Sequence, residues 1–241
     1  MDGVARGGLT DVVPRHVFVT GGTGYIGRVL IPELLARGHG VRALVRPGSE
    51  GKLPSSCDAV FGDALDATTF AHKLAPADTL VHLVGVPHPA PWKARAFREV
   101  DLASIQASVG AALAAGVRHL VYLSVAQPAP TMRAYVAVRA AGESHIRAAG
   151  LDATFVRPWY VLGPGHRWPY LVAPLYKLGE KIPFTREAAL RLGLVTLREM
   201  VAALAQAVEA PPHGIHLVDV PAIRAAGEAA AALERGIVGF A

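Results

Sequence analysis

The strongest constraint on the fold of this sequence is a glycine-rich segment, TGGTGYIG, at Thr20 to Gly27. The apolar run HVFVT, His16 to Thr20, ends at the first residue of this segment, and apolar residues at helical spacing follow the segment as far as Arg37. In a strand–loop–helix unit, such glycines allow a tight turn and bring an anion close to the free N–H groups of the helix start. The segment therefore predicts a phosphate-binding turn in an α/β protein.

The same alternation of short β-branched runs and longer helical patterns continues along the chain. Strands are expected at 16–20, 41–45, 59–61, 79–85, 119–125, 153–157 and 215–220, and helices at 25–37, 94–115, 132–149, 197–210 and 223–233. This order predicts a doubly wound parallel Rossmann sheet with helices on both faces. We expect one domain over residues 1–241, with residues 158–241 contributing most of a small C-terminal substrate lobe.

The glycines of the loop have separate predicted roles. Gly21 permits the tight turn, Gly24 allows the backbone to approach a diphosphate, and Gly27 lets the helix pack closely. A glycine-rich turn with no ligand is the alternative interpretation. The loop residues expected to contact a dinucleotide are Gly21, Thr23, Gly24, Tyr25, Ile26, Gly27 and Arg28.

The residue after the second expected strand indicates which dinucleotide is bound. NAD-binding proteins commonly place a carboxylate there, where it accepts from the ribose 2′-hydroxyl. This chain has Arg46 instead, and no carboxylate before Glu50. Because a guanidinium can bind a 2′-phosphate, Arg46 and Arg28 favour NADP(H), with NAD(H) possible. The alternative is that both are ordinary solvated arginines.

Composition excludes several other classes of protein. The single cysteine, Cys57, rules out an intramolecular disulfide framework and a cysteine-based zinc site, and no metal site is expected. The net charge of +5 comes from scattered basic residues, so no nucleic-acid partner is predicted. No secretory apolar region or bilayer-length stretch is present, which favours a cytoplasmic protein without an integral membrane segment. The helices at 94–115 and 132–149 could form a homodimer face.

Further motifs follow the later strands: GDALD at 62–66, HLVG at 82–85, YLSV at 122–125, YVAVR at 135–139 and RPWYVLGPG at 157–165. With the glycine loop, they resemble the short-chain dehydrogenase/reductase superfamily in its extended or atypical branch, over residues 16 to about 220. The resemblance is closest to NmrA-like proteins and to the nucleotide-binding accessory subunit of respiratory complex I. It implies that Asp63 contacts the adenine and that Leu83, Val84 and Gly85 line the cofactor. From spacing alone, Asp63 is equally compatible with a turn or cap residue.

The resemblance also implies a catalytic set. The family uses a serine at the end of the fifth strand and a Tyr-x-x-x-Lys helix, which Ser124 and Tyr135 match, but Arg139 replaces the lysine. Residues four apart share a helix face, so a cation at 139 lies beside the phenol. The resemblance implies that Arg139 also hydrogen-bonds the ribose of the cofactor. Arg139 cannot relay a proton as lysine can. Asp101 lies where many relatives have an asparagine.

Structural roles for the same hydroxyl groups remain open: Tyr135 as a half-buried helix aromatic, and Ser124 as a hydroxyl that satisfies the strand terminus.

Aromatic residues are concentrated between Trp159 and Phe184, among glycines and prolines. They predict a wall over a small-molecule substrate, with Trp159 and Trp168 in the wall and His166 and Arg167 as anchors for an anionic or quinone-like group. Packing of the lobe onto the sheet is the alternative. The predicted function is an NADP(H)-dependent oxidoreductase or epimerase acting on a carbonyl, alcohol or quinone-like substrate; the alternative is a catalytically silent NADP(H)-binding redox sensor or assembly scaffold.

Overall fold

The computed structural model describes residues 13–164, 187 and 189–238, and its centre is a seven-stranded sheet in the order β3-β2-β1-β4-β5-β6-β9. Every pair of neighbouring strands is parallel. This confirms the predicted parallel α/β sheet. The strands are β1 (His16–Thr20), β2 (Gly40–Val45), β3 (Asp58–Phe61), β4 (Thr79–His82), β5 (His119–Leu123), β6 (Asp152–Val156) and β9 (Ile215–Val218).

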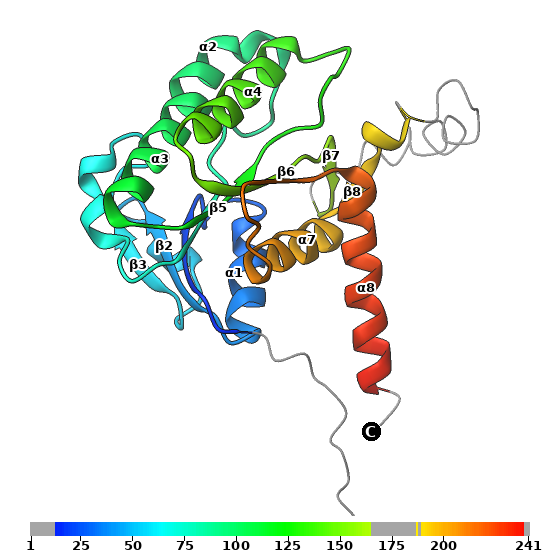
Figure 1. The fold of residues 1–241 in the computed structure, drawn as a ribbon, viewed down its shortest axis with the longest axis horizontal. Coiled ribbons are helices and arrows are strands. Elements are labelled where there is room, and N and C mark those ends of the chain that lie inside the picture. The colour runs from blue at the N-terminus through cyan, green and yellow to red at the C-terminus, as the bar shows by residue number, and fades with distance from the viewer. Residues whose placement is uncertain (1–12, 165–186, 188, 239–241) are drawn as a thin grey trace, which may run out of the picture.

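Helices cover both faces of the sheet (Figure 1). Val17 and Val19 of β1 pack in one apolar cluster with α1 (Gly27–Ala36) and α7 (Leu197–Glu209). Phe18, which points to the opposite face because side chains alternate along a strand, packs with α3 (Ala103–Ala115) and α4 (Arg133–Ala148). The doubly wound Rossmann arrangement is therefore confirmed.

The long helix predicted at 94–115 is not continuous. It is divided into α2 (Ala94–Ala96), a π-helical segment η5 (Phe97–Leu102) and α3. The prediction of one uniform helix was wrong because a period of 3.6 residues does not reveal a local widening to i→i+5 hydrogen bonds. Phe97 and Asp101 are the two buried residues of η5.

Short single-turn helices connect the remaining elements. They are η1 (Glu50–Lys52), η2 (Ala67–Thr69), η3 (Ala71–Lys73) and η4 (Pro91–Lys93). The predicted homodimer face on α3 and α4 stays a prediction, since the structure describes a single chain.

The described C-terminal elements contribute to the main body as well as to its periphery. The strands β7 (Tyr160–Leu162) and β8 (Leu194–Thr196) form a separate two-stranded sheet, whereas β9 joins the central sheet and α7 covers one of its faces. A capping box between Thr196 and Glu199 starts α7. Most of the predicted substrate wall lies outside the described residues, so the substrate lobe stays a prediction.

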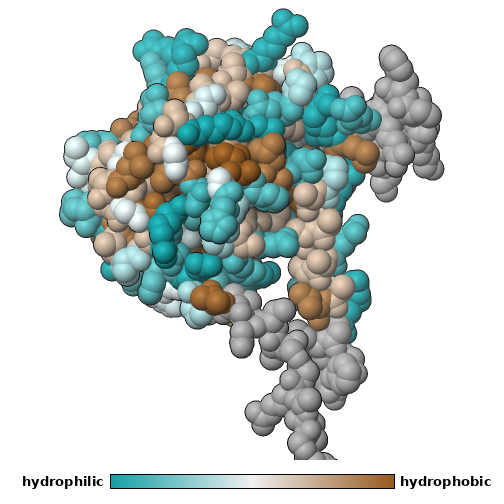
Figure 2. Space-filling model, in the orientation of Figure 1, coloured by the Kyte–Doolittle hydropathy of each residue, from teal (hydrophilic) through white to brown (hydrophobic). Residues whose placement is uncertain are grey.

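The last helix, α8 (Val220–Val238), packs against α7 and projects away from the body (Figure 1). It starts three residues before the predicted helix and ends five residues after it. Figure 2 shows hydrophobic surface on the projecting part. Leu233 is 70% exposed there. This helix therefore contributes little to the core beyond its first turns.

Candidate functional site

The glycine loop after β1 lies directly against the chain segment that follows β4. Gly21 has a φ of +78°, and a Cβ there would lie 2.8 Å from the carbonyl carbon of Leu83 and 2.9 Å from the nitrogen of Val84. Both the dihedral angle and the close approach require glycine. The structure therefore brings together two segments predicted to line the same cofactor, residues 20–27 and 83–85.

The start of α1 is open to an anion. A Cβ on Gly27 would lie 2.5 Å from the carbonyl oxygen of Gly22, so only glycine lets the helix begin over the loop backbone. Gly24 donates its N–H to the Gly21 carbonyl at 3.0 Å, which closes the turn. No side chain caps the helix, and its first turn holds no acidic residue. The N–H groups of Arg28 and Val29 already donate to carbonyls of the loop, so it is the partial positive charge of the helix start that suits a diphosphate.

The order of the sheet reverses at this loop, because β2 and β3 lie on one side of β1 and β4, β5 and β6 lie on the other. Ligands of open α/β sheets bind at such a switch point, outside the carboxyl ends of the strands. A dinucleotide held by its diphosphate on the loop extends in both directions. One half would face the ends of β2 and β3, and the other the ends of β4 and β5.

Three predicted side chains are exposed on the β2 side. Arg46 directly follows β2, and Arg28 lies in the first turn of α1. Asp63 follows β3, where its Oδ1 accepts from the Leu65 N–H at 3.0 Å. The turn role of Asp63 is confirmed, and its predicted contact with adenine stays a prediction.

On the β5 side, the Arg139 guanidinium is buried in a set of internal contacts. Its Nη1 donates to the Leu123 carbonyl at 2.8 Å, and its Nη2 lies 2.7 Å from Oδ1 of Asp101. A Cβ on Gly85 would lie 2.3 Å from that Nη2, so the guanidinium packs directly against Gly85. Burial favours loss of the Arg139 proton, but the neighbouring Tyr135, Tyr122 and Asp101 outweigh it and raise the pKa of Arg139. Arg139 is therefore a fixed positive charge.

Asp101 is the counterion of this charge and is fully buried. Its second oxygen, Oδ2, accepts from the Val86 N–H at 2.9 Å. Burial raises the pKa of Asp101, while Arg139 and the Val86 N–H oppose that shift. Asp101 thus connects α4 to the segment after β4.

Tyr135 lies in the first turn of α4 and is half-buried. Its ring centroid is 5.2 Å from the Cζ of Arg139 and 5.0 Å from the ring centroid of Phe97. The structure therefore places Tyr135 beside Arg139, as the four-residue spacing predicts.

Ser124 faces a different partner. Its hydroxyl donates to Oε1 of Glu143 at 2.6 Å. Among the described residues, no hydrogen bond joins Ser124 to Tyr135. The proton of Ser124 is therefore directed to Glu143, and its oxygen is left able to accept.

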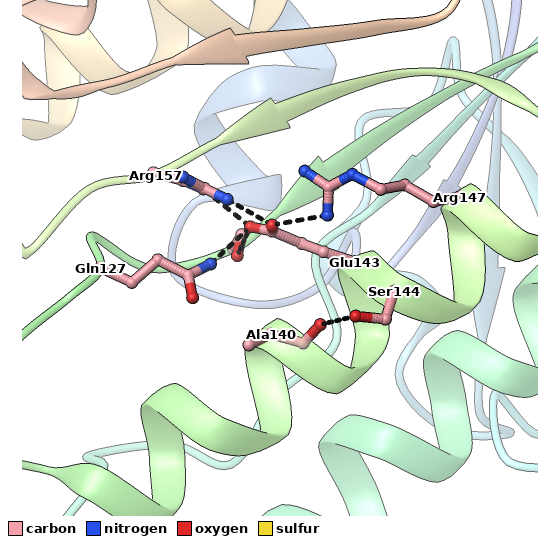
Figure 3. A network of polar contacts seen from close by, with 7 residues as sticks. Gln127, Ala140, Glu143, Ser144, Arg147 and Arg157 are labelled. Atoms are coloured by element: carbon pink, nitrogen blue, oxygen red, sulfur yellow. Dashed lines mark hydrogen bonds and ion pairs between the residues drawn. The ribbon is translucent and has the colours of Figure 1, made fainter.

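The Glu143 carboxylate is the centre of a polar cluster that the sequence interpretation missed. It accepts from Gln127 Nε2 at 3.0 Å and from Arg157 Nε at 2.8 Å, and it also pairs with Arg147 (Figure 3). A signal was present, because Tyr135, Arg139 and Glu143 are each four residues apart on one helix face. Only the structure shows which groups that face meets.

A second buried polar group, His82, supports the end of β4. Its Nδ1 lies 2.9 Å from Thr20 Oγ1 and 3.0 Å from Ser108 Oγ. Burial, with a smaller effect of Arg139, lowers the pKa of His82 to about 3. The imidazole is therefore neutral, and its hydrogen bonds fix the junction of β1 and β4 beneath the loop.

Of the predicted substrate residues, Trp159 is described and is half-buried between β6 and β7. His166, Arg167 and Trp168 lie outside the described residues. In the described ranges, no three His, Cys, Asp or Glu residues are grouped so that they could hold a metal ion. No helix in those ranges combines the length and the apolar content needed to cross a bilayer.

A family model described as NAD(P)H-binding matches residues 21–172. The chain belongs to this NAD(P)H-binding family. Membership confirms the predicted class of cofactor, and it fits the glycine cradle at Gly21 and the uncapped start of α1. The choice between NAD(H) and NADP(H) is not decided by family membership.

Several curated proteins are similar in sequence to this NAD(P)H-binding chain. A ceramide reductase of Caulobacter vibrioides is 28% identical over 225 residues, which cover 91% of this chain and 68% of that protein. A 4-hydroxy-2-methyl-3-oxo-4-farnesyl-3,4-dihydroquinoline-1-oxide ketoreductase of Stigmatella aurantiaca is 27% identical over 61% of this chain and 51% of its own length. A 3-beta-hydroxysteroid dehydrogenase of Mycolicibacterium neoaurum is 32% identical over 44% of this chain and 31% of its own length. The chain thus spans about half or less of the last two relatives.

Solved structures share the fold of the NAD(P)H-binding chain. The Bordetella bronchiseptica enzyme WbmH in complex with NAD+ superposes with a TM-score of 0.64 at 21% identity, over 86% of this chain and 76% of that one. A UDP-galactose 4-epimerase superposes with a TM-score of 0.62 at 20% identity, over 85% of this chain and 78% of that one. A short-chain dehydrogenase/reductase superfamily protein of Agrobacterium tumefaciens with bound NAD superposes with a TM-score of 0.62 at 18% identity, over 85% of this chain and 77% of that one. They show that the chain has the fold of short-chain dehydrogenase/reductase superfamily proteins, as the resemblance in sequence predicts; its NmrA-like and complex I parts stay predictions.

Proposed function

We propose that the protein is an NADP(H)-dependent oxidoreductase of a carbonyl or alcohol substrate, and that Arg28 and Arg46 bind the 2′-phosphate. The observation that carries the cofactor choice is the pair of exposed guanidinium groups beside the glycine loop, at the end of β2 and the start of α1. No carboxylate stands between Val45 and Glu50 to accept from a ribose 2′-hydroxyl. A guanidinium matches a phosphate with two parallel hydrogen bonds, so these residues favour the phosphorylated coenzyme.

The bound dinucleotide would supply or accept a hydride at its nicotinamide ring. Tyr135 would exchange a proton with the substrate oxygen, and Arg139 would stabilise the phenolate from its fixed position 5.2 Å from the ring. Ser124 would accept a hydrogen bond from the substrate hydroxyl or the phenol, because its own proton is directed to Glu143. The chain thus contributes position and charge. An epimerase would use the same groups.

The aromatic residues after β6 support an apolar substrate. Trp159 and Tyr160 are described members of that group, and the matching relatives are named for ceramide, a farnesylated quinoline and a steroid. We extend this to an apolar carbonyl or quinone-like substrate, with His166, Arg167 and Trp168 completing its site.

The cofactor proposal is tested by calorimetry with NADPH and NADH. In the double variant Arg28→Ala/Arg46→Ala, the Kd for NADPH is expected to rise about 100-fold, because two charge-assisted contacts are lost, whereas binding of NADH changes little. Arg118→Ala is the matched control, since Arg118 is exposed before β5 at the opposite end of the sheet. Equal losses for both coenzymes would contradict recognition of the 2′-phosphate.

The reaction is tested by following oxidation of NADPH with a panel of quinones, aldehydes and keto-sugars. Tyr135→Phe is expected to reduce turnover at least about 100-fold with little change in NADPH binding, because the proton donor is lost while the ring remains. Turnover that survives the substitution would remove Tyr135 from the mechanism.

One observation favours the alternative of a catalytically silent redox sensor or assembly scaffold. Both Ser124 and Arg139 are held by internal carboxylates, Glu143 and Asp101. Tight NADPH binding without oxidation by any acceptor in the panel would support that alternative over the enzyme.

A further inference from the structure

The segment η5 is unusual because π-helical turns are rare and concentrate at functional sites. It spans Phe97–Leu102 directly before α3, and its two buried side chains are Phe97 and Asp101. Both point to the same neighbour, α4, with which η5 is in extensive contact. We therefore look for the role of this π turn in its contacts with α4.

Two pairs of residues join the segments. Phe97 meets Tyr135, with ring centroids 5.0 Å apart, and Asp101 meets Arg139, with Oδ1 and Nη2 2.7 Å apart. Phe97 and Asp101 are four residues apart, and so are Tyr135 and Arg139. In a regular helix, residues at this spacing are offset by about 40° around the axis; the wider π turn shifts that offset. The segment thus presents one partner to each of the two α4 residues.

The Asp101–Arg139 pair also forms the floor of the site beneath Gly85. The Arg139 Nη2 and the Asp101 Oδ1 would lie 2.3 Å and 3.2 Å from a Cβ at that position. The side chains of Arg139 and Asp101 are 4% and 0% exposed. A single ionised partner left at this depth is costly, so each charge depends on the other for its position.

We propose that η5 is a positioning clamp for α4, in which Asp101 fixes the Arg139 guanidinium against Gly85 and Phe97 fixes the Tyr135 ring. This inference rests on the proposed function, since it concerns the half of the site that faces the nicotinamide. Asp101 and Phe97 are positioning residues, because they act through Arg139 and Tyr135.

The first test uses the protein without ligand. In a proton–nitrogen NMR spectrum, the Nε–Hε resonance that disappears in Arg139→Lys identifies Arg139. The clamp predicts a sharp, slowly exchanging resonance in the wild type and a broadened, fast-exchanging one in Asp101→Asn, because the guanidinium loses its counterion. In Phe97→Leu that resonance stays sharp, whereas the Tyr135 ring resonances shift as the neighbouring ring is removed.

The second test compares NADPH with 2′,5′-ADP by calorimetry. The fragment reaches the glycine loop and the arginines of the β2 side, but not Arg139. Asp101→Asn is expected to raise the Kd for NADPH about tenfold and to change the Kd for 2′,5′-ADP by no more than about twofold, since only the β5 side is disturbed. Phe97→Leu, which keeps the ion pair, is expected to raise the Kd for NADPH about threefold and likewise to leave the Kd for 2′,5′-ADP nearly unchanged.

Thr154→Val is the matched control for lost stability. It removes the buried hydrogen bond of 3.1 Å between His119 and Thr154, which touches no residue of the clamp. The clamp is overturned if Asp101→Asn keeps the sharp Arg139 resonance, or if it weakens NADPH and 2′,5′-ADP equally, as a general loss of stability would. Failure of the wild type to bind any pyridine dinucleotide would instead overturn the proposed function, and the NMR result would still decide the clamp.

Discussion

The two sides of the switch point are built on different principles. On the β2 side, glycine backbone and exposed side chains, Arg28 and Arg46, present their hydrogen-bonding groups outward. On the β5 side, the side chains of Asp101, Ser124 and Arg139 are buried and directed to one another or to Glu143. The β2 side thus presents exposed groups to a ligand, whereas many polar side chains of the β5 side are bonded to one another. Substitution of the exposed side chains of the β2 side should therefore damage binding alone, whereas substitution of the buried polar groups of the β5 side should also damage folding.

The largest effect is expected from the buried carboxylate of the β5 side. Glu143→Ala should reduce the free energy of unfolding by about 4 kcal/mol, because it leaves the Arg157 guanidinium and the Gln127 amide without their acceptor. Chemical denaturation would measure the loss. Glu99→Gln, which removes the exposed pair with Arg95, should cause no measurable change. Equal effects of the two substitutions would remove the distinction between the buried and the exposed charges.

The next effect tests the claim that the β2 side depends on backbone geometry. Gly27→Ala should cost about 3 kcal/mol and abolish dinucleotide binding, because the new Cβ would meet the Gly22 carbonyl oxygen at 2.5 Å. Gly110→Ala is the control within α3, where a Cβ meets nothing within 4 Å. That substitution should stabilise the helix by about 0.5–1 kcal/mol. Calorimetry would measure dinucleotide binding, and thermal unfolding would measure the stability of both variants. A Gly27→Ala variant that still binds NADPH would contradict the proposed binding of the dinucleotide at the glycine loop.

The smallest effect for a single step of change is that of one pH unit on one buried histidine. The pKa of His82 is lowered to about 3 and that of His119 to about 4, chiefly by burial. An unfolded histidine titrates near 6.5, so the unfolded chain binds protons first on acidification. Stability present above about pH 6.5 should therefore fall toward pH 4 by about 1.4 kcal/mol per pH unit for each of the two groups.

Denaturation curves between pH 7 and pH 4 would measure this slope. His82→Gln should remove one proton from those taken up on unfolding, and so lower the slope. His213→Gln, at an exposed position before β9, is the matched control variant. A slope that stays the same in His82→Gln would show that the imidazole by β4 is accessible to protons in the folded state.

The sequence predicted the fold well because its signals are local. The strand at His16–Thr20 matches residue for residue, and the limits of the other six predicted strands agree within three residues, whereas β7 and β8 were not predicted. Gly21 and Gly27 could be interpreted from the sequence because their constraint lies in the backbone of a strand–loop–helix unit. The position of Arg46 directly after a strand was predicted for the same reason, and its contact with a 2′-phosphate stays a prediction.

The partners on the β5 side could not be predicted, because they join distant parts of the chain. Ser124 meets Glu143 nineteen residues later, and Asp101 meets Arg139 from another helix. The π turn at Phe97 has no periodic signature, since it depends on packing against α4. Spacing predicted that Tyr135 and Arg139 share a face, but it could not show which carboxylate each residue on that face would meet.

The position of β9 has a consequence for synthesis of the chain. Ala153 of β6 pairs with Ile215 of β9, so the seventh strand joins the sheet across an interval of 62 residues. Until the ribosome has released that late strand, β6 presents a bare row of amide and carbonyl groups. A nascent chain that stalls within this interval exposes the unpaired edge of β6, which is then open to chaperone binding or to aggregation with another chain.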